Sequence, residues 1–244
     1  MKRRLYWLTL VSLAGLTSLL CFTALGQQEV SVTGQIDFGN KTGSRAPDSS
    51  NAVVWLTPAG NAPQKQTVAL QRQQFIQKNK SFVPHLLVVQ VGSSVDFPNQ
   101  DPFFHNVFSL FDGKRFDLGL YEAGSTRSVV FNKVGVSYIF CNIHPEMSAV
   151  VIAVKTPYYG ISDKKGALNI PQVPPGRYEM QVWHERVLPE TLSTLTRSIV
   201  ISSGSSSLGT IRLPEQRNTS ELHKNKYGED YDTPATGSPV YPRP

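Results

Sequence analysis

Short apolar runs with a two-residue period constrain the fold of this chain more than any other feature of its sequence. Runs such as VSVTGQIDF, LLVVQV and GVSYIFC are rich in valine and aromatic residues. An alternation of this kind puts apolar side chains on one face of a β-strand. Turn-forming residues separate the runs, as at Pro58, Gly92, Gly124 and Gly135. No stretch has a convincing helical period, so the sequence predicts an all-β protein with enough strands for a sandwich.

The first 26 residues are typical of a secretory signal peptide. Lys2, Arg3 and Arg4 precede an apolar run that ends in the small-residue pattern Ala24-Leu25-Gly26. We therefore expect cleavage before Gln27 and a periplasmic or otherwise exported protein. The alternative is an uncleaved membrane anchor, because the run approaches the roughly 20 residues that span a bilayer.

Cleavage would leave one thiol in the mature chain. The sequence has two cysteines, and Cys21 would be removed with the signal. In an oxidising compartment thiols normally pair or bind a metal, so the remaining Cys141 is a candidate ligand. Losing three basic residues would also lower the net charge from +6 to +3. The other basic residues are dispersed, so we expect no nucleic-acid partner.

Composition divides the rest of the chain into three parts. Residues 27–155 carry most of the strand-like runs and predict a first β domain. A boundary near Thr156-Pro157 precedes a shorter β segment over residues 156–213. The last part, residues 214–244, is rich in Pro, Gly, Ser, Thr and charge, with almost no aliphatic side chains, and predicts a disordered tail.

The stretch CNIHPEM places three soft or borderline metal ligands in seven residues: Cys141, His144 and Met147. A fully extended chain would separate the first from the last by roughly 20 Å, so their convergence requires a tight loop. Strand-like runs precede and follow the stretch, and Pro145 restricts the turn between them. The thiolate, imidazole and thioether can therefore point into one small space.

A second imidazole is available from His105 in DPFFHNVFSL, at the start of an apolar strand. One thiolate and two imidazoles, with a long axial methionine, form an electron-transfer site for one copper ion. This geometry lies between the preferences of Cu(I) and Cu(II), so little rearranges when an electron arrives or leaves. The apolar surroundings, which tune the potential of such a site, include Phe103, Phe104, Val107 and Phe108.

These residues resemble those of the cupredoxins, especially the plastocyanin and amicyanin branch. The resemblance covers residues 30–155 and rests on HNV at 105–107, on Cys141 36 positions after His105, and on the C-x2-H-x2-M spacing. It implies a Greek-key β-sandwich with copper at one end and redox protein partners that dock around His144. Pro145 and Phe103 would belong to the docking patch. Asn106 would tie the two ligand loops together.

The second β segment resembles the carboxypeptidase regulatory-like module, a small transthyretin-like sandwich. The resemblance rests on GALNI and VPPGRYEMQVWHE. It implies a module that binds or spaces rather than catalyses.

The three remaining histidines lack neighbouring ligands in the sequence. We expect a structural role for His85 before a strand, and a satisfied surface or interface position for His184 beside Glu185. His223 lies in the predicted tail.

Three functions fit the sequence, and none of them is enzymatic. The first is a one-electron carrier between redox proteins. The second is a copper carrier or buffer that uses the same ligands. The third is a structural or interaction protein of the cell envelope. His-x-His pairs, C-x-x-C-H, G-x-S-x-G and H-E-x-x-H are all absent from the sequence, so we expect neither catalysis nor a small-molecule substrate.

Overall fold

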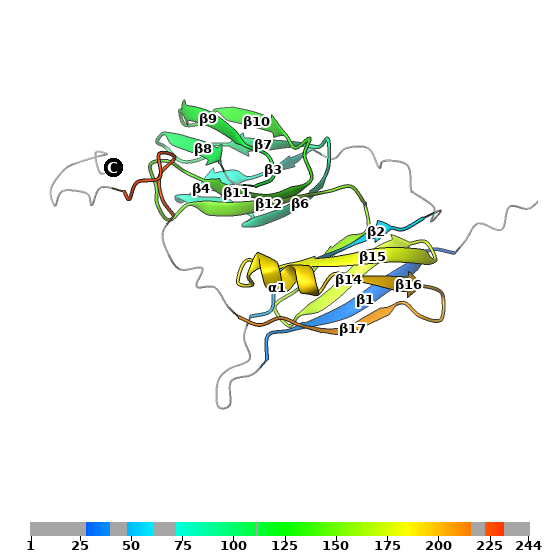
Figure 1. Ribbon diagram of the computed structural model, residues 1–244. Helices are drawn as coiled ribbons and strands as arrows, with labels where there is room; N and C mark the ends of the chain where they lie inside the picture. The colour runs from blue at the N-terminus through cyan, green and yellow to red at the C-terminus, as the bar shows by residue number, and fades with distance from the viewer. Residues whose placement is uncertain (1–27, 40–47, 61–71, 111, 216–222, 232–244) are drawn as a thin grey trace, which may run out of the picture.

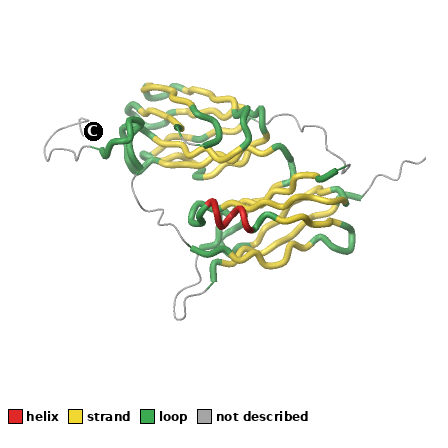
Figure 2. Tube along the Cα trace, viewed as in Figure 1, coloured by secondary structure: helices red, strands yellow, loops and turns green. Residues whose placement is uncertain are grey.

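The computed structural model describes residues 28–39, 48–60, 72–110, 112–215 and 223–231. The predicted signal peptide, residues 1–26, lies outside them. Strands dominate the described residues, and a single six-residue helix, α1 (Pro189–Thr194), accompanies them (Figure 2). The predicted all-β fold is confirmed. None of the described helices has the length and apolar character needed to cross a membrane.

Two β units lie one above the other (Figure 1). We call the first the site unit. Its five-stranded sheet has the order β6-β12-β11-β8-β9, its three-stranded sheet has the order β10-β7-β3, and β4 pairs with β5. The bounds are β3 (Gln73–Gln74), β4 (Ile76–Lys78), β5 (Ser81–Val83), β6 (Leu86–Gln90), β7 (Ser94–Pro98), β8 (His105–Ser109), β9 (Phe116–Tyr121), β10 (Thr126–Val130), β11 (Gly135–Phe140) and β12 (Ser148–Val154).

The core of the site unit lies between its two main sheets. Aromatic side chains fill it, with Phe75 and Phe97 stacked at 5.8 Å between ring centroids. Val95 of β7 and Ile139 of β11 are fully buried there. Cys141 belongs to the same cluster, so the side chain of the predicted thiol ligand is packed within the apolar core and is not exposed on a surface loop.

We call the second body the companion unit. One sheet has the order β14-β1-β17 and the other the order β13-β2-β15-β16. Helix α1 connects two strands of the second sheet. The bounds are β1 (Val30–Asp37), β2 (Val53–Pro58), β13 (Tyr159–Ile161), β14 (Ala167–Val173), β15 (Gly176–Trp183), β16 (Arg197–Ile201) and β17 (Ser207–Arg212).

The predicted assignment of residues 27–155 to one domain is wrong for the first two strands. β1 pairs antiparallel with β14 and parallel with β17, while β2 pairs antiparallel with β15. Both strands therefore belong to the companion unit, and the site unit is inserted between them and the rest of that unit. A two-residue period identifies a strand but says nothing about its partner, because pairing depends on contacts distant in sequence.

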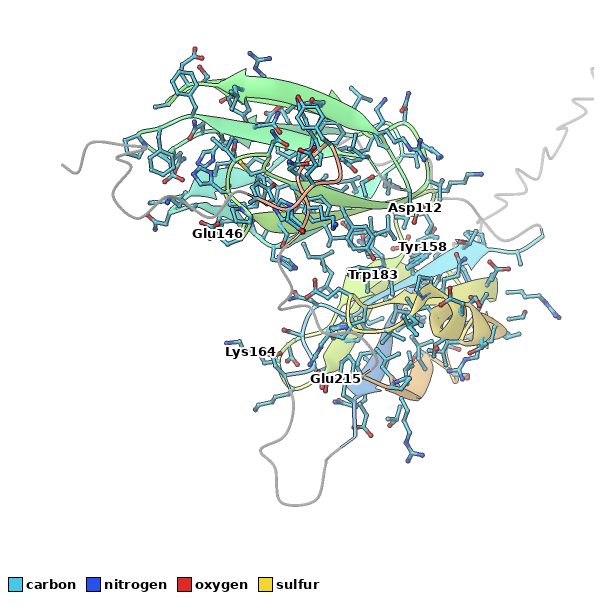
Figure 3. The ribbon with its side chains drawn as sticks, turned by 60° about the vertical axis from the view of Figure 1, so that its left-hand side comes forward. Asp112, Glu146, Tyr158, Lys164, Trp183 and Glu215 are labelled. Atoms are coloured by element: carbon cyan, nitrogen blue, oxygen red, sulfur yellow. The ribbon has the colours of Figure 1, made fainter. Side chains whose placement is uncertain are left out.

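Strand β12 joins the two units through opposite faces. Ala149, Val151 and Ala153 contribute to the core of the site unit. Val150, Ile152 and Val154 belong instead to a cluster that includes the core of the companion unit. Tyr158 and Trp183, of the same cluster, are labelled near the junction in Figure 3. Burial on both faces explains why MSAVVIAV reads as an almost continuous apolar run.

An ion pair between His85 and Glu185 also links the units. Nε2 of His85, just before β6, lies 2.8 Å from Oε2 of Glu185, which follows β15. The adjacent His184 is buried, with Nε2 3.1 Å from the carbonyl oxygen of Ser50. Both histidines therefore have polar partners at or near the junction.

This ion pair predicts a pH-dependent part of the stability. The hydrogen bond to Glu185 raises the pKa of His85, although burial opposes the rise. A raised pKa gives stability that is complete below the unfolded value near 6.5 and is lost as the pH rises through the folded value. His85→Gln should thus lower the melting temperature more at pH 6 than at pH 8.5. The effect should not exceed about 1 kcal/mol, because the pair is partly exposed. Glu185→Gln should lower the melting temperature with the same pH dependence as His85→Gln. If His85→Gln lowered the melting temperature equally at both pH values, the prediction would be contradicted.

Candidate metal centre

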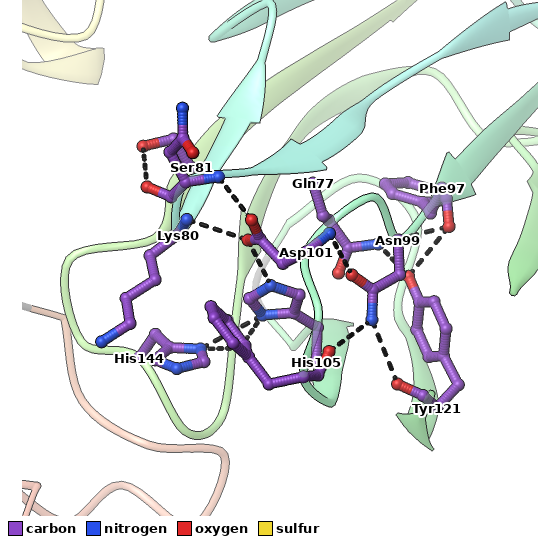
Figure 4. A network of polar contacts seen from close by, with 12 residues as sticks. Gln77, Lys80, Ser81, Phe97, Asn99, Asp101, His105, Tyr121 and His144 are labelled. Carbon is purple, nitrogen blue, oxygen red and sulfur yellow. Dashed lines mark hydrogen bonds and ion pairs between the residues drawn. The ribbon is translucent and has the colours of Figure 1, made fainter. Parts of the chain in front are cut away.

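Three candidate ligands from two separate segments come together at one end of the site unit. His105 is the first residue of β8, and Cys141 directly follows β11, the strand beside β8. Sγ of Cys141 lies 3.7 Å from Nδ1 of His105 and 3.5 Å from Nδ1 of His144. The two Nδ1 atoms are 3.1 Å apart. Figure 4 shows the two imidazole rings directed toward each other.

The two separations from Sγ of Cys141 to the imidazoles, 3.7 and 3.5 Å, have the size that a trigonal metal site needs, and the 3.1 Å between the two Nδ1 atoms is somewhat shorter. Nitrogen and sulfur donors lie about 2.0–2.3 Å from a first-row ion such as zinc, so trigonal donors are about 3.5–3.8 Å apart. The three donor atoms of this cluster all lie within 4.8 Å of one another. His105 and Cys141 have no exposed surface, and His144 is 5% exposed. Two imidazoles and a thiol in a dry setting fit copper.

The loop between β11 and β12 is closed by its own backbone. The N–H of Cys141 donates to the carbonyl oxygen of Met147 at 3.3 Å, and the N–H of Met147 donates to that of His144 at 3.1 Å. The antiparallel pairing of Phe140 with Ser148 continues directly from these bonds. Met147 is fully buried in the same apolar cluster as Cys141. Its role as the axial ligand stays a prediction.

Burial sets the protonation of the three ligands in the metal-free protein. It lowers the pKa of His105, although Asp101 opposes the shift. Burial, followed by repulsion from His105, lowers the pKa of His144 to about 4. Burial also raises the pKa of the Cys141 thiol. At neutral pH the cluster therefore holds two neutral imidazoles and one protonated thiol.

This protonation state predicts that Cu(II) binding at pH 7 releases about one proton per ion. Metal ligands must be deprotonated, and only the thiol of Cys141 still carries a proton that the metal displaces. Calorimetry in buffers with different ionisation enthalpies measures the number. Cys141→Ser should reduce it to near zero, and a release of two protons would show that one imidazole is charged in the free protein.

Of the two phenylalanines before His105, only Phe103 packs on the ligands. Its ring centroid lies 5.2 Å from that of His105 and 5.5 Å from that of His144. Phe104 was predicted to lie beside the metal, but it is 51% exposed. A side chain this exposed does not form the dry surroundings that were predicted for it.

The side chain of Asn106 has a different partner from the one that the resemblance implied. Its amide Nδ2 donates to Oδ1 of Asp117 on β9 at 2.7 Å. Its carbonyl Oδ1 is buried and has no hydrogen-bond partner among the described residues. The side chain therefore joins two neighbouring strands instead of the two ligand loops.

The C-terminal segment, residues 223–231, packs against the outside of the ligand loop. Tyr231 donates its hydroxyl to the carbonyl oxygen of Cys141 at 2.6 Å. The ring of His223 stacks on Phe140 at 4.4 Å, and its Nε2 lies 3.3 Å from the carbonyl oxygen of His144. Predicted disorder for residues 214–244 is thus wrong for this segment. The signal in the sequence was a histidine and two tyrosines close together within residues 223–231.

Lys226 ties the same segment to both sides of the site. Its backbone N–H donates to Oδ1 of Asn142 in the ligand loop at 2.8 Å. Its ammonium lies 2.8 Å from Oδ2 of Asp117, whose other carboxylate oxygen accepts from Asn106. The segment therefore restrains the loop that carries Cys141 and His144 from outside the sandwich.

No family model matches the chain, and no curated protein matches it closely enough to count as a relative. Solved structures that match include a purple cupredoxin from Nitrosopumilus maritimus, with 26% identity over 34% of this chain and 99% of that one (TM-score 0.31). A copper-containing nitrite reductase from Thermus scotoductus SA-01 matches with 22% identity over 38% of this chain and 25% of its own length (TM-score 0.33). A mutant of amicyanin in its Cu(I) form shows 18% identity over 41% of this chain and 98% of that one (TM-score 0.33). At these TM-scores the likeness carries no argument about function.

Proposed function

We propose that this chain is an exported type 1 copper protein that carries single electrons between redox proteins. The observation that carries the proposal is the convergence of two imidazoles and one thiol, all three buried, with donor atoms within 4.8 Å of one another. His105, Cys141 and His144 would hold the ion, and Met147 would supply an axial sulfur. When bound, copper would supply one-electron exchange between Cu(I) and Cu(II).

The protein contributes rigidity and the exclusion of water. Two strands, β8 and β11, position His105 and Cys141 within one sheet, and β12 is packed on both faces. A site held in this way keeps its geometry when the charge of the ion changes. Burial of the donors and the ring of Phe103 keep solvent from rearranging around them. Both properties favour fast electron transfer.

A copper carrier or buffer is the second candidate, and it would use the same donors. Such a function needs a site from which copper exchanges readily. The burial of Cys141 and His144, together with the C-terminal segment on the loop, favours retention of the ion. A purely structural role for the chain would not explain why His105, Cys141 and His144 converge.

Electron self-exchange and copper loss to a chelator separate the first two functions. The electron carrier should exchange electrons rapidly between its Cu(I) and Cu(II) forms and release copper slowly to a chelator in excess. Slow self-exchange with rapid copper loss would support the buffer and contradict our proposal.

We propose that redox partners dock over Phe103, Pro145 and the edge of His144. Phe103 and Pro145 are half-buried, and they flank the ligand that lies nearest to solvent among the three. An apolar contact there would bring a partner close to the metal with little rearrangement. We also propose that residues 1–26 direct export and that residues 156–213, which supply β13 to β17 of the companion unit, act as a carboxypeptidase regulatory-like module. N-terminal sequencing of the purified native protein tests the first of these two points.

The axial role of Met147 predicts a higher reduction potential for Met147→Leu. Removal of the thioether weakens stabilisation of the oxidised ion, whereas the three stronger ligands keep it bound. The matched control is Met180→Leu. Met180 is a buried methionine on β15 of the companion unit, so its substitution should not change the reduction potential. Voltammetry of both variants gives the comparison. An unchanged potential for Met147→Leu would exclude the axial role.

A further inference from the structure

A buried carboxylate binds the back of the His105 ring. Oδ2 of Asp101 lies 2.8 Å from Nε2 of His105, the ring nitrogen that faces away from Cys141 and His144 (Figure 4). The side chain of Asp101 is 5% exposed and that of His105 has no exposed surface. Asp101 therefore places a carboxylate in direct contact with a candidate ligand.

The turn between β4 and β5 fixes the position of this carboxylate. Asn79 and Lys80 have the left-handed backbone angles φ 53° and 54°. Their successive N–H groups donate to Oδ1 and Oδ2 of Asp101 at 2.6 and 2.9 Å. Consecutive N–H groups that converge in this way form an anion-binding nest. Positive φ at both residues is what a two-residue hairpin turn requires, and Lys78 and Ser81 pair on either side of this one. The hairpin thus presents both N–H groups to the carboxylate.

Asn99 binds the backbone of Asp101. Its Oδ1 accepts from the backbone N–H of Asp101 at 3.0 Å, and its Nδ2 donates to the carbonyl oxygen of Phe103 at 2.8 Å. Burial opposes ionisation of Asp101, but the bonds from Lys80, His105 and Asn79 hold the pKa of its carboxyl below the ordinary value. The chain just before His105 and the charge behind its ring are therefore both set by hydrogen bonds.

The bond determines which ring nitrogen of His105 faces the metal. An ionised carboxylate only accepts hydrogen bonds, so Nε2 must carry the proton and Nδ1 keeps its lone pair. Nδ1 is the atom that lies near Cys141 and His144. A negative charge behind the ring also favours the more highly charged state of a bound ion.

Resting on the proposed function, we propose that Asp101 is a positioning residue for His105 that also lowers the reduction potential of the copper ion. It holds the imidazole in the tautomer that binds through Nδ1, and its charge stabilises Cu(II) more than Cu(I). The expected contribution to Cu(II) affinity is about 10- to 100-fold, the usual effect of such outer carboxylates.

Asp101→Asn tests the proposal, with Asp96→Asn as the matched control. Asp96 lies on β7, where it is bound by Arg72 and Ser128 and not by a candidate ligand. Asp101→Asn should lower Cu(II) affinity about 10- to 100-fold, lower Cu(I) affinity less, and therefore raise the reduction potential. Asp96→Asn should change neither quantity. If both variants retain the wild-type affinities and potential, the proposal is overturned.

A measurement on the unaltered protein decides the question even if Asp101→Asn does not fold. Nitrogen-15 NMR of the copper-free and Cu(I)-loaded protein should show a proton on Nε2 of His105 that exchanges slowly with water. An Nε2 proton that is absent, or that exchanges as fast as that of the partly exposed His85, would overturn the proposal. If the wild-type protein bound no copper, the proposed function would be excluded. The spectrum of the copper-free protein would still show whether Nε2 of His105 donates to Asp101.

Discussion

Cys141→Ser should abolish the intense visible absorption that we expect of the protein loaded with Cu(II). That colour would come from charge transfer between a thiolate and the ion, and Cys141 is the one cysteine among the described residues. Serine is similar in size and its hydroxyl is a poor ligand for copper. Because the change replaces one sulfur atom by oxygen and leaves the rest of the apolar cluster intact, far-ultraviolet circular dichroism should still show a folded β protein. Visible spectra of both proteins at equal copper loading give the comparison.

His85→Gln is the matched control, since it removes a histidine that lies outside the donor cluster. It should leave the visible spectrum unchanged. A coloured Cys141→Ser variant would show that another ligand dominates the spectrum. A colourless wild type with bound copper would exclude a type 1 site.

Ile152→Ala should destabilise both units together. Ile152 is 1% exposed and lies on the face of β12 that packs with the companion unit. Truncating a buried isoleucine to alanine costs about 2–5 kcal/mol, because packing contacts are lost and a cavity remains. For a chain of this size each kcal/mol lowers the melting temperature by about 2–4 °C. Calorimetry of the wild type and the variant measures the shift, and one transition should move as a whole.

Val200→Ala is the matched control for this second change. Val200 lies on β16 of the companion unit and is 59% exposed. Its truncation should alter the free energy of unfolding by no more than about 0.5 kcal/mol. If Ile152→Ala were equally mild, the apolar contact between the two units would be absent in solution.

Features that depend on short stretches of sequence could be predicted. The two-residue period located strands such as β1 and β11, because it arises within each strand. Cys141, His144 and Met147 share one loop, so their spacing alone indicated a joint role. His105 was the histidine set among phenylalanines at the start of a strand, and the structure brings its Nδ1 to the thiol.

Features that depend on distant contacts could not be predicted. The main partners of β1 and β2 lie more than a hundred residues away, and strand pairing carries no local signature. The role of Asp101 depends on a turn 21 to 22 residues earlier that supplies two N–H groups. Composition predicted disorder for the tail, whereas a few bonds from Tyr231 and Lys226 to the ligand loop hold part of it in place.

The insertion of the site unit into the companion unit has a consequence for biosynthesis. During synthesis the segment from β3 to β12 is complete at Val154, when β13 to β17 do not yet exist. The companion unit can close its sheets only after Arg212, because β1 must wait for β14 and β17. Domains generally fold as units while the chain grows from its N-terminus. The copper ligands can thus assemble first, and the early strands stay unpaired for the longest time.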